Sequence, residues 1–351
     1  MSRARRPLRI GLLGCGGIAQ IAHLPALRKA HNVELVAVCD KDEKLARRMA
    51  ARYGVDKVYT EQKDMCAQAG IEAVLNTTRE QHHLATVVEA MDLGMHVLVE
   101  KPLAPTVEEC EAMVAAARRH GVKLQMGCMK RHDPSLQRAQ QFAREQMGQQ
   151  LLVSGWCFDS VYHGRYVETL GKQPERGDAQ VYPESLASPH LRDVMGYGVH
   201  SLDLVLWFGG PMTKVSTFGS EGDEGMVSVS LLEFASGALG TFQVVRTVQM
   251  DWTEGIQVHG AGGSVIAHTP FPYFHTHADV TIFDAAQQAY LKPAAPGVDM
   301  YQRQLEAFAQ AIFDDGPVTP SGEDGLRDQQ VILAMHESYK TGQAVAVGSN
   351  R

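Results

Sequence analysis

The first third of the chain alternates short apolar runs with stretches whose apolar positions recur every three or four residues. The short runs predict β-strands, and the periodic stretches predict helices. Strand and helix repeated in this way indicate parallel βαβ units in one sheet, with right-handed crossovers and helices on both faces. The predicted strands are 8–13, 33–39, 73–76, 96–99 and 123–127, and the predicted helices are 18–30, 42–53, 84–93 and 107–120.

The last of these helices has capping signals at both its start and its end. Thr106 and Glu109 have the spacing of a capping box, in which each side chain bonds a backbone N–H at the beginning of a helix. Gly121 follows the last periodic residue and is the usual stop signal.

After about residue 128 the pattern changes to strands that follow one another through short turns such as Ser236-Gly237. Short turns join antiparallel neighbours. We therefore expect an α/β protein of two domains, with a parallel sheet in residues 1–127 and an α+β domain around a large, mostly antiparallel sheet in residues 128–351. The later strands are predicted at 226–234, 238–246, 255–259 and 280–283, and the later helices at 134–147, 300–313 and 323–341.

Two segments, 159–191 and 269–277, fit no regular element and are rich in His, Arg and aromatic residues. Long loops in compact domains are usually functional or disordered. This composition suits a polar ligand, and the alternative is an arm that holds an oligomer together. From the first segment we expect Tyr162 and Arg165 to contact the substrate.

A glycine-rich turn follows the first predicted strand and opens the first predicted helix. Gly14, Gly16 and Ala19 form G-x-G-x-x-A, whose small residues permit a tight turn, a close pyrophosphate and close helix packing. The free N–H groups at the helix start favour the pyrophosphate. Asp40 ends the second strand, where a carboxylate accepts a hydrogen bond from a ribose 2′-hydroxyl. These features predict a dinucleotide-binding Rossmann domain, with NAD favoured over NADP, although Lys41 weakens that preference.

The triplet Glu100-Lys101-Pro102 follows the strand predicted at 96–99, at the carboxyl edge of the sheet, where open α/β sheets bind ligands. Pro102 favours an extended backbone at Lys101. An ammonium group beside the nicotinamide would stabilise a developing alkoxide. A lysine before a proline is otherwise a common surface residue, so the nearby cofactor motif is what makes Lys101 a catalytic candidate.

The chain resembles the family of sugar and cyclitol dehydrogenases that includes glucose–fructose oxidoreductase and inositol 2-dehydrogenase. The resemblance implies hydride exchange with a secondary alcohol, and a C-terminal open sheet that forms homodimers or homotetramers. It places the catalytic lysine at Lys101 and the acid/base histidine at His200. The matching segments are Gly14 to Ala19, Asp40, the turn 77–82, Glu100-Lys101-Pro102, Gly198-Val199-His200 with Asp203, and 337–342. The implied cofactor contacts are Gly14, Gly16, Gly17, Ile18, Asp40, Thr77, His82, Glu100 and Lys101.

Oxidation of an alcohol needs a base for the hydroxyl proton, and the unperturbed pKa of histidine, near ~6.5, suits His200 to that task. The chain departs from the family four residues earlier, where Gly196 replaces the usual aspartate. Asp193 and Tyr197 are the nearest substitutes. We expect Asp193 to act as a catalytic residue that touches His200 or the substrate; the alternative is that it only pairs with Arg192 or another cation.

Two further expectations complete the proposed site. Arg131, Tyr197, Lys101 and His200 are expected to contact the substrate together with the two loop residues. A second departure from the family is Thr78, where many members carry proline after the threonine.

Composition narrows the remaining classes. With 33 basic and 40 acidic residues the net charge is −7, which argues against nucleic-acid and anionic-membrane partners. No apolar run approaches the ~18 residues of a membrane span. The six cysteines form no C-x-x-C pair, which favours reduced thiols in a cytoplasmic protein. No spacing matches a closed zinc site, so we expect no metal.

Three functions are consistent with these patterns. The leading one is an NAD-dependent dehydrogenase of a sugar, glycoside or cyclitol. The second is a glycosidase that oxidises a ring carbon transiently with bound NAD, so that NADH does not accumulate. The third is a non-catalytic NAD-binding regulator, which the glycine at 196 favours and the presence of both Lys101 and His200 disfavours.

Overall fold

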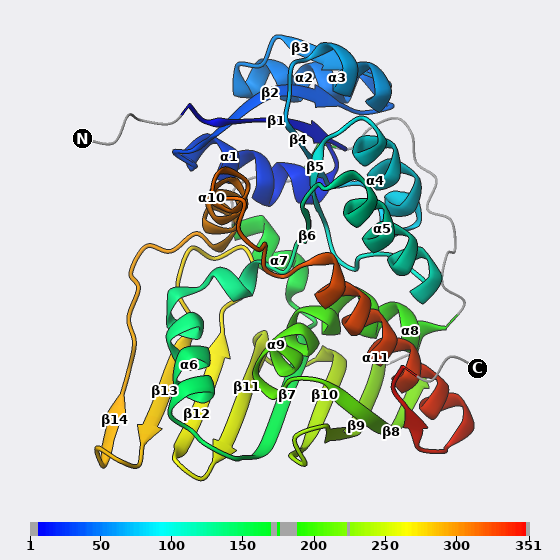
Figure 1. The fold of residues 1–351 in the computed structure, drawn as a ribbon. Coiled ribbons are helices and arrows are strands. Elements are labelled where there is room, and N and C mark those ends of the chain that lie inside the picture. The colour runs from blue at the N-terminus through cyan, green and yellow to red at the C-terminus, as the bar shows by residue number, and fades with distance from the viewer. Residues whose placement is uncertain (1–5, 170–173, 176–187, 223–224, 349–351) are drawn as a thin grey trace. The chain divides into compact units, whose positions relative to one another are not determined.

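The computed structural model describes residues 6–169, 174–175, 188–222 and 225–348. The chain divides into two compact units (Figure 1). The first comprises Met1–Met129, Lys172–Ser185 and Asp299–Leu326, and the second comprises Lys130–Gly171, Leu186–Val298 and Arg327–Arg351. Within the described ranges, no helix is long and apolar enough to cross a membrane.

The first unit is built on a six-stranded parallel sheet with the order β3-β2-β1-β4-β5-β6. The chain runs from β1 outward to β3 and then crosses back to β4, so the strand order reverses between β1 and β4. Such a reversal leaves a crevice at the carboxyl ends of the strands, where open α/β sheets bind ligands. The strands are β1 (Leu8–Leu13), β2 (Val33–Cys39), β3 (Lys57–Tyr59), β4 (Ala73–Asn76), β5 (His96–Val99) and β6 (Leu124–Met126).

Helices cover this sheet (Figure 1). Apolar side chains of the strands and of the helices together form the core of the unit. The capping box predicted for α5 is confirmed, because Thr106 accepts from the backbone N–H of Glu109 and Glu109 accepts from that of Thr106. Gly121 ends the helix in the left-handed conformation, with φ of 63°. The helices are α1 (Leu24–Lys29), α2 (Glu43–Tyr53), α3 (Gln62–Gln68), α4 (His83–Asp92), α5 (Val107–His120) and α10 (Met300–Phe313), with the turns η1 (Ala19–His23) and η2 (Glu80–His82).

The second unit is built on a nine-stranded sheet with the order β14-β13-β12-β11-β7-β10-β9-β8-β15. All its pairs are antiparallel except β7 with β10, which is parallel. The strands are β7 (Gln150–Ser160), β8 (Met212–Gly222), β9 (Gly225–Phe234), β10 (Leu239–Val248), β11 (Thr253–Gly260), β12 (Gly263–Thr269), β13 (Asp279–Asp284), β14 (Ala289–Leu291) and β15 (Val345–Ala346).

One face of this sheet carries the helices α6 and α9, which enclose the main core of the unit together with the end of α11 (Figure 1). Asp133 caps the start of α6 by accepting from the backbone N–H groups of Ser135 and Leu136. The elements are α6 (Pro134–Glu145), α7 (His163–Thr169), α8 (Pro189–Asp193), η4 (Val194–Gly198), α9 (Val199–Gly209) and α11 (Gly322–Thr341), whose first residues belong to the first unit; the short turn η3 (Met129–His132) precedes α6.

The predicted fold class is confirmed, and the differences are local. The helix expected at 18–30 begins with a π-helical turn at Ala19–His23. No range was predicted for β3, α3, β7, β8, β12, β14 and β15. The expectation that 159–191 contains no regular element is wrong for His163–Thr169 and Pro189–Asp193. The structure describes nothing of 170–173 and 176–187, so the rest of that expectation lies outside the described residues.

Candidate active site

The glycine turn lies at the switch point of the first sheet. The backbone N–H of Gly14 donates to the carbonyl of Cys39 at 2.8 Å, at the end of β2. On the other side, the Thr77 hydroxyl donates to the carbonyl of Gly14 at 2.7 Å, beyond the end of β4. The turn is therefore fixed between both neighbouring strands, at the crevice that the topology creates.

The backbone of this turn fits a dinucleotide. Gly14 has φ of +89°, and a Cβ there would lie 3.1 Å from the carbonyl carbon and oxygen of Thr77. At Gly16 a Cβ would meet no protein atom within 4 Å. Gly14 therefore serves the fold, whereas open space faces Gly16, where a pyrophosphate needs to approach. Gly17 and half-buried Ile18 form the first helical residues after the turn.

Asp40 faces the glycine turn from the end of β2. Its Oδ2 accepts from the backbone N–H of Cys15 at 2.6 Å, and its Oδ1 accepts from that of Asp42 at 2.8 Å. A carboxylate has about four acceptor positions, so each oxygen keeps a lone pair for a further donor such as a ribose hydroxyl. The residues present therefore fit the adenosine end of a dinucleotide.

Glu100 turns away from the edge of the sheet into a buried pair. Its Oε1 lies 2.6 Å from Nε2 of His23 in η1, and its Oε2 accepts from the backbone N–H of Lys101 at 3.2 Å. Burial raises the pKa of Glu100, but the hydrogen bonds and charges of His23 and Lys101 together outweigh burial, so this pKa lies below its ordinary value. The pair joins the helix after the glycine turn to the segment that carries Lys101, which is half-buried directly after β5.

Two adjacent histidines follow β4, and they have different surroundings. His82, which the sequence singles out for the cofactor, ends η2 and is exposed. His83 is fully buried, with Nδ1 3.1 Å from the carbonyl oxygens of both Pro102 and Leu103 and Nε2 3.0 Å from that of Thr78. Burial lowers its pKa. His83 thus connects the two loops that flank the crevice, a role that was not predicted.

A short distant segment also joins the glycine turn. The Glu175 carboxylate bonds with Arg48 at 2.6 Å and with Arg52, both on α2. Its backbone N–H donates to Gln20 at 2.8 Å, and the same Gln20 side chain donates to the carbonyl of Cys15. Nothing in the sequence indicated this contact, because the partners lie more than a hundred residues apart.

In the second unit, His200 lies in the first turn of α9 and is 8% exposed. The Arg131 guanidinium donates to both oxygens of Asp203, at 2.9 and 2.6 Å, and lies 5.6 Å from the ring of Trp207. Both members of this ion pair are buried. Arg131, a predicted substrate ligand, is therefore bonded to the helix that carries His200.

A second buried pair holds the same turn of α9. The fully buried Lys130 ammonium is paired with Glu254 on β11 and donates to the Thr269 hydroxyl at 3.2 Å. The Ser201 hydroxyl, next to His200, donates to the other oxygen of Glu254. Buried bonds at Ser201 and Asp203 thus fix the turn of α9 that carries His200. Lys130, Ser201 and Glu254 were not predicted from the sequence.

The carboxylate of Asp193 is paired with arginines. It accepts from Arg192 at 3.1 Å and from Arg246 at 3.4 Å, which is the arrangement expected if Asp193 pairs with cations. Arg246 also lies 3.5 Å from the centroid of the half-buried Tyr197 ring. At Gly196 a Cβ would meet no atom within 4 Å, so the position of the family aspartate is open.

The loop residues predicted to contact the substrate stack on one another. The guanidinium of exposed Arg165 lies 5.1 Å from the ring of Tyr162 at the start of α7. The catalytic and binding roles of these residues stay predictions.

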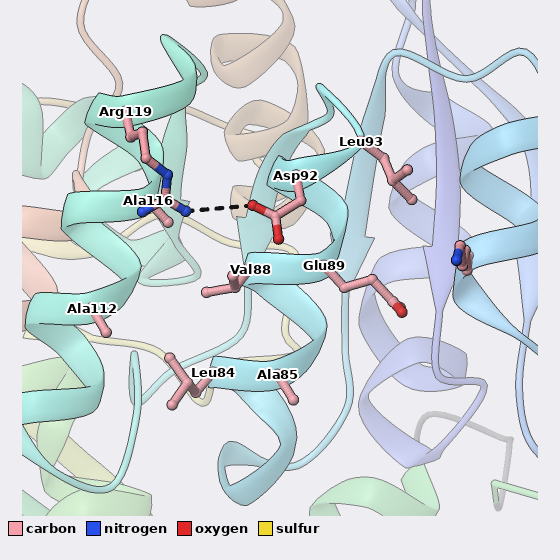
Figure 2. Close-up of a pocket in the computed structure, with 10 residues that line it drawn as sticks. Leu84, Ala85, Val88, Glu89, Asp92, Leu93, Ala112, Ala116 and Arg119 are labelled. Carbon is pink, nitrogen blue, oxygen red and sulfur yellow. Dashed lines mark hydrogen bonds and ion pairs between the residues drawn. The ribbon is translucent and has the colours of Figure 1, made fainter.

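A separate groove of about 700 Å³ lies on the outside of the first unit, between α4 and α5 (Figure 2). Its floor is apolar, and Arg119 bonds with Asp92 across it at 3.4 Å. It contains none of the predicted site residues. The lining residues are Lys63, Leu84, Ala85, Val88, Glu89, Asp92, Leu93, Ala112, Ala116 and Arg119.

All six cysteines are buried thiols that form no disulfide with one another. Burial is the main cause that raises the pKa of Cys39 to about 12 and that of Cys66 to about 11. Neither Cys39 nor Cys66 is therefore set up as a nucleophile, because the thiolate is the reactive form.

Comparison with known proteins agrees with the two-part architecture. Residues 8–128 match the oxidoreductase family, NAD-binding Rossmann fold, and residues 194–347 match the C-terminal alpha/beta domain of the same family. The chain is 27% identical to D-xylose 1-dehydrogenase (NADP(+)) 2 of Haloferax volcanii, over 96% of this chain and 99% of the relative. It is 28% identical to 1,5-anhydro-D-fructose reductase of Ensifer adhaerens, over 97% and 98%.

The fold is also that of a solved structure, scyllo-inositol dehydrogenase from Lactobacillus casei with bound cofactor NAD(H) and scyllo-inositol. The TM-score is 0.76 at 21% identity, covering 98% of this chain and all of the other. The glycine turn, the Glu-Lys-Pro triplet and both matched domains thus lead to one conclusion: the chain belongs to the Gfo/Idh/MocA family of oxidoreductases, with an NAD-binding Rossmann domain.

Proposed function

We propose that this oxidoreductase transfers a hydride between NAD and a secondary alcohol of a sugar, glycoside or cyclitol. Two groups carry the proposal. Lys101 lies directly after β5 and is joined through Glu100 to the helix after the glycine turn, and His200 lies on a helix fixed by buried ion pairs. Relatives named for xylose and anhydrofructose support the substrate class. We assign residues 1–127 to the cofactor and 128–351 to substrate binding and assembly.

Lys101 and His200 have different tasks in the proposed reaction. When bound, NAD supplies the hydride acceptor. The Lys101 ammonium stabilises the negative charge that develops on the alcohol oxygen. His200 takes the hydroxyl proton, a task that suits an imidazole near neutral pH. The buried pairs that bind Ser201 and Asp203 hold the turn of His200 in one place, so little reorganisation is needed when the substrate arrives.

NAD preference rests on Asp40. Its carboxylate lies against the glycine turn, where it suits two ribose hydroxyls and repels a 2′-phosphate. One relative is named for NADP(+), so the choice needs a direct test. Both cofactors should be titrated against the apo protein and against Asp40→Ala. The parent should bind NAD at least ~10-fold more tightly than NADP, a difference of about 1.4 kcal/mol. In Asp40→Ala this difference between the two cofactors should be smaller. Equal binding to the parent would remove Asp40 from cofactor choice.

Turnover separates the enzymatic alternatives. A panel of sugars, glycosides and cyclitols should be followed by NADH absorbance and by product analysis. A dehydrogenase accumulates NADH in step with the oxidised product. Glycoside cleavage without NADH would indicate transient oxidation instead, and NAD binding without any turnover would indicate a regulator.

We also propose that the chain forms a homodimer or homotetramer in the cytoplasm through the open face of the nine-stranded sheet. Side chains on alternate strand positions leave large apolar groups exposed there, and exposed apolar patches mark interaction sites. These groups are Phe218, Leu231, Leu239, Ile266 and Tyr290. Six cysteines without a disulfide suit a reducing compartment. Light scattering should show an oligomer that Leu231→Glu dissociates, and a monomeric parent would contradict the proposal.

A further inference from the structure

A histidine outside the predicted site is held by a buried carboxylate. Nδ1 of His163, at the start of α7, lies 3.0 Å from Oδ1 of Asp159 at the end of β7. Asp159 is 2% exposed, and its Oδ2 pairs with Nε of Arg246 at 2.9 Å. A carboxylate paired with arginine is an acceptor, so it selects the tautomer of His163 that carries the proton on Nδ1. Nε2 is then the atom that faces a further partner.

The arginine makes this support rigid. Arg246 bridges Asp159 and Asp193 and lies over the ring of Tyr197. The two carboxylates and the guanidinium come from β7, α8 and β10, so three elements converge below His163. The His163 side chain itself remains 35% exposed. A purely structural histidine is normally enclosed, whereas this one is fixed at Nδ1 and keeps about a third of its side chain exposed.

Aromatic rings surround His163 edge-on. Their centroids lie 6.0 Å away for Tyr197, 5.9 Å for Trp252 and 5.3 Å for Phe271. The Trp252 indole N–H is enclosed, and no acceptor for it occurs among the residues that the structure describes. Aromatic faces that carry a few fixed polar groups suit a ring whose C–H face is apolar and whose edge bears hydroxyls.

The position relates this cluster to the catalytic helix. Tyr197 lies in η4 (Val194–Gly198), which runs directly into α9, three residues before His200. Residues three apart on a helix are neighbours on its surface. A ligand that contacts Tyr197 is thus next to the first turn of α9.

We propose that His163, together with Trp252 and Tyr197, binds the hydroxylated ring of the substrate, with Nε2 of His163 accepting a hydrogen bond from a ring hydroxyl. The inference rests on the proposed function for its substrate class. It assigns His163 to substrate recognition, with Asp159 and Arg246 as residues that position it. No proton is transferred at His163 in this role, so its loss weakens binding and leaves the hydride step intact.

The test combines a residue change with a substrate change. His163→Phe keeps the ring packing and removes Nε2, and His259→Gln is a control histidine in the same sheet, bonded to Ser264. With the best substrate of the panel, His163→Phe should raise KM by about 3- to 10-fold, the loss of one neutral hydrogen bond, with kcat within 2-fold. Deoxy analogues of that substrate should identify one hydroxyl whose removal raises the KM of the parent by about the same factor. Removal of that hydroxyl should leave the KM of His163→Phe unchanged.

Direct binding keeps the inference separate from the proposed function. The NAD-loaded protein should be titrated with D-xylose, D-glucose and myo-inositol while tryptophan fluorescence is recorded, and Trp252→Phe should remove the signal. Saturable binding that His163→Phe weakens supports the inference even if no hydride is transferred. Turnover with an unchanged KM in His163→Phe overturns it while the dehydrogenase stands. Absence of binding to all three compounds and to every panel substrate also overturns it.

Discussion

Two glycines of the dinucleotide turn should respond to alanine in opposite ways. Gly14 has φ of +89°, and its new Cβ would lie 3.1 Å from the backbone of Thr77. Gly16 has no positive φ, and its new Cβ would meet no protein atom within 4 Å. Gly14→Ala therefore disturbs the folded chain itself, whereas Gly16→Ala only fills space in which a pyrophosphate has to lie.

The magnitudes follow from these contacts. A left-handed backbone at a residue with a Cβ costs roughly 1–2 kcal/mol, and the Thr77 contact adds to this. Gly14→Ala should thus lose about 2 kcal/mol of unfolding free energy, or roughly 4–8 °C in Tm. Gly16→Ala should stay within ~0.5 kcal/mol of the parent without cofactor. A methyl group against the pyrophosphate should still raise its Kd for NAD at least ~10-fold, which corresponds to about 1.4 kcal/mol.

Thermal unfolding of the apo proteins and calorimetric titration with NAD measure the two quantities separately. The expected pattern is lost stability for Gly14→Ala alone and lost NAD affinity for both variants. If Gly16→Ala bound NAD as the parent does, the pyrophosphate would not lie at that turn. If Gly14→Ala were as stable as the parent, the backbone argument would fail.

Four other outcomes follow from the described contacts. Lys101→Ala and His200→Ala should each lower kcat at least ~100-fold while NAD still binds; full activity in either variant would remove that residue from the mechanism. Glu175→Gln removes the charge that pairs with Arg48 and Arg52 and so loosens the segment that Gln20 bonds to the glycine turn. The rate of NAD release, measured by stopped flow, should rise about 3- to 10-fold, the size of effect expected for one charge-assisted hydrogen bond. Gly196→Asp has open space for its side chain and should fold normally, and a carboxylate there should move the acid limb of the pH–rate profile, because it raises the pKa of a nearby histidine. Burial, and then the charge of His336, lowers the pKa of His190 from 6.5 to about 4. Between pH 6.5 and pH 4 the unfolded chain therefore binds more protons than the folded chain, so Tm should fall as the pH is lowered through this range. His190→Gln should make this fall of Tm shallower.

The first unit was predictable because its strands are fully buried runs and its helices carry their own start and stop signals. The strand β4 is buried at every position, and α5 has both its capping box and its C-terminal glycine. The strand β3 was missed because Lys57–Tyr59 is three residues long with one aliphatic side chain. Periodicity can identify local elements of this kind, and it says nothing about strands too short to show a period.

One missed residue did have a signal in the sequence. The buried positions of α4 include His83, Val87, Ala90 and Met91, which follow the spacing of one helix face. His83 falls on that face and His82 does not. Extending the predicted helix by one residue would have placed His83 inside and left His82 exposed.

The remaining site contacts join residues too far apart in the chain for any local pattern. Arg131 and Asp203 are 72 positions apart, and Arg246 reaches back to Asp159 over 87. The sequence shows each of them only as a charged residue, without its partner. Only the fold reveals which opposite charge allows it to be buried.

These pairs also bear on the aspartate that the family has at position 196. Three buried carboxylates surround the stretch from α8 to α9, and each one is paired with arginine: Asp203 with Arg131, and Asp159 and Asp193 with Arg246. Removing one partner from such a pair leaves an uncompensated buried charge, at a cost of about 3–5 kcal/mol. Any role of Asp193 at His200 or at the substrate therefore has to be compatible with its pairing to Arg192 and Arg246. The buried bonds at Ser201 and Asp203 hold the backbone next to His200 in place, so this part of the support for the histidine does not depend on a carboxylate at position 196.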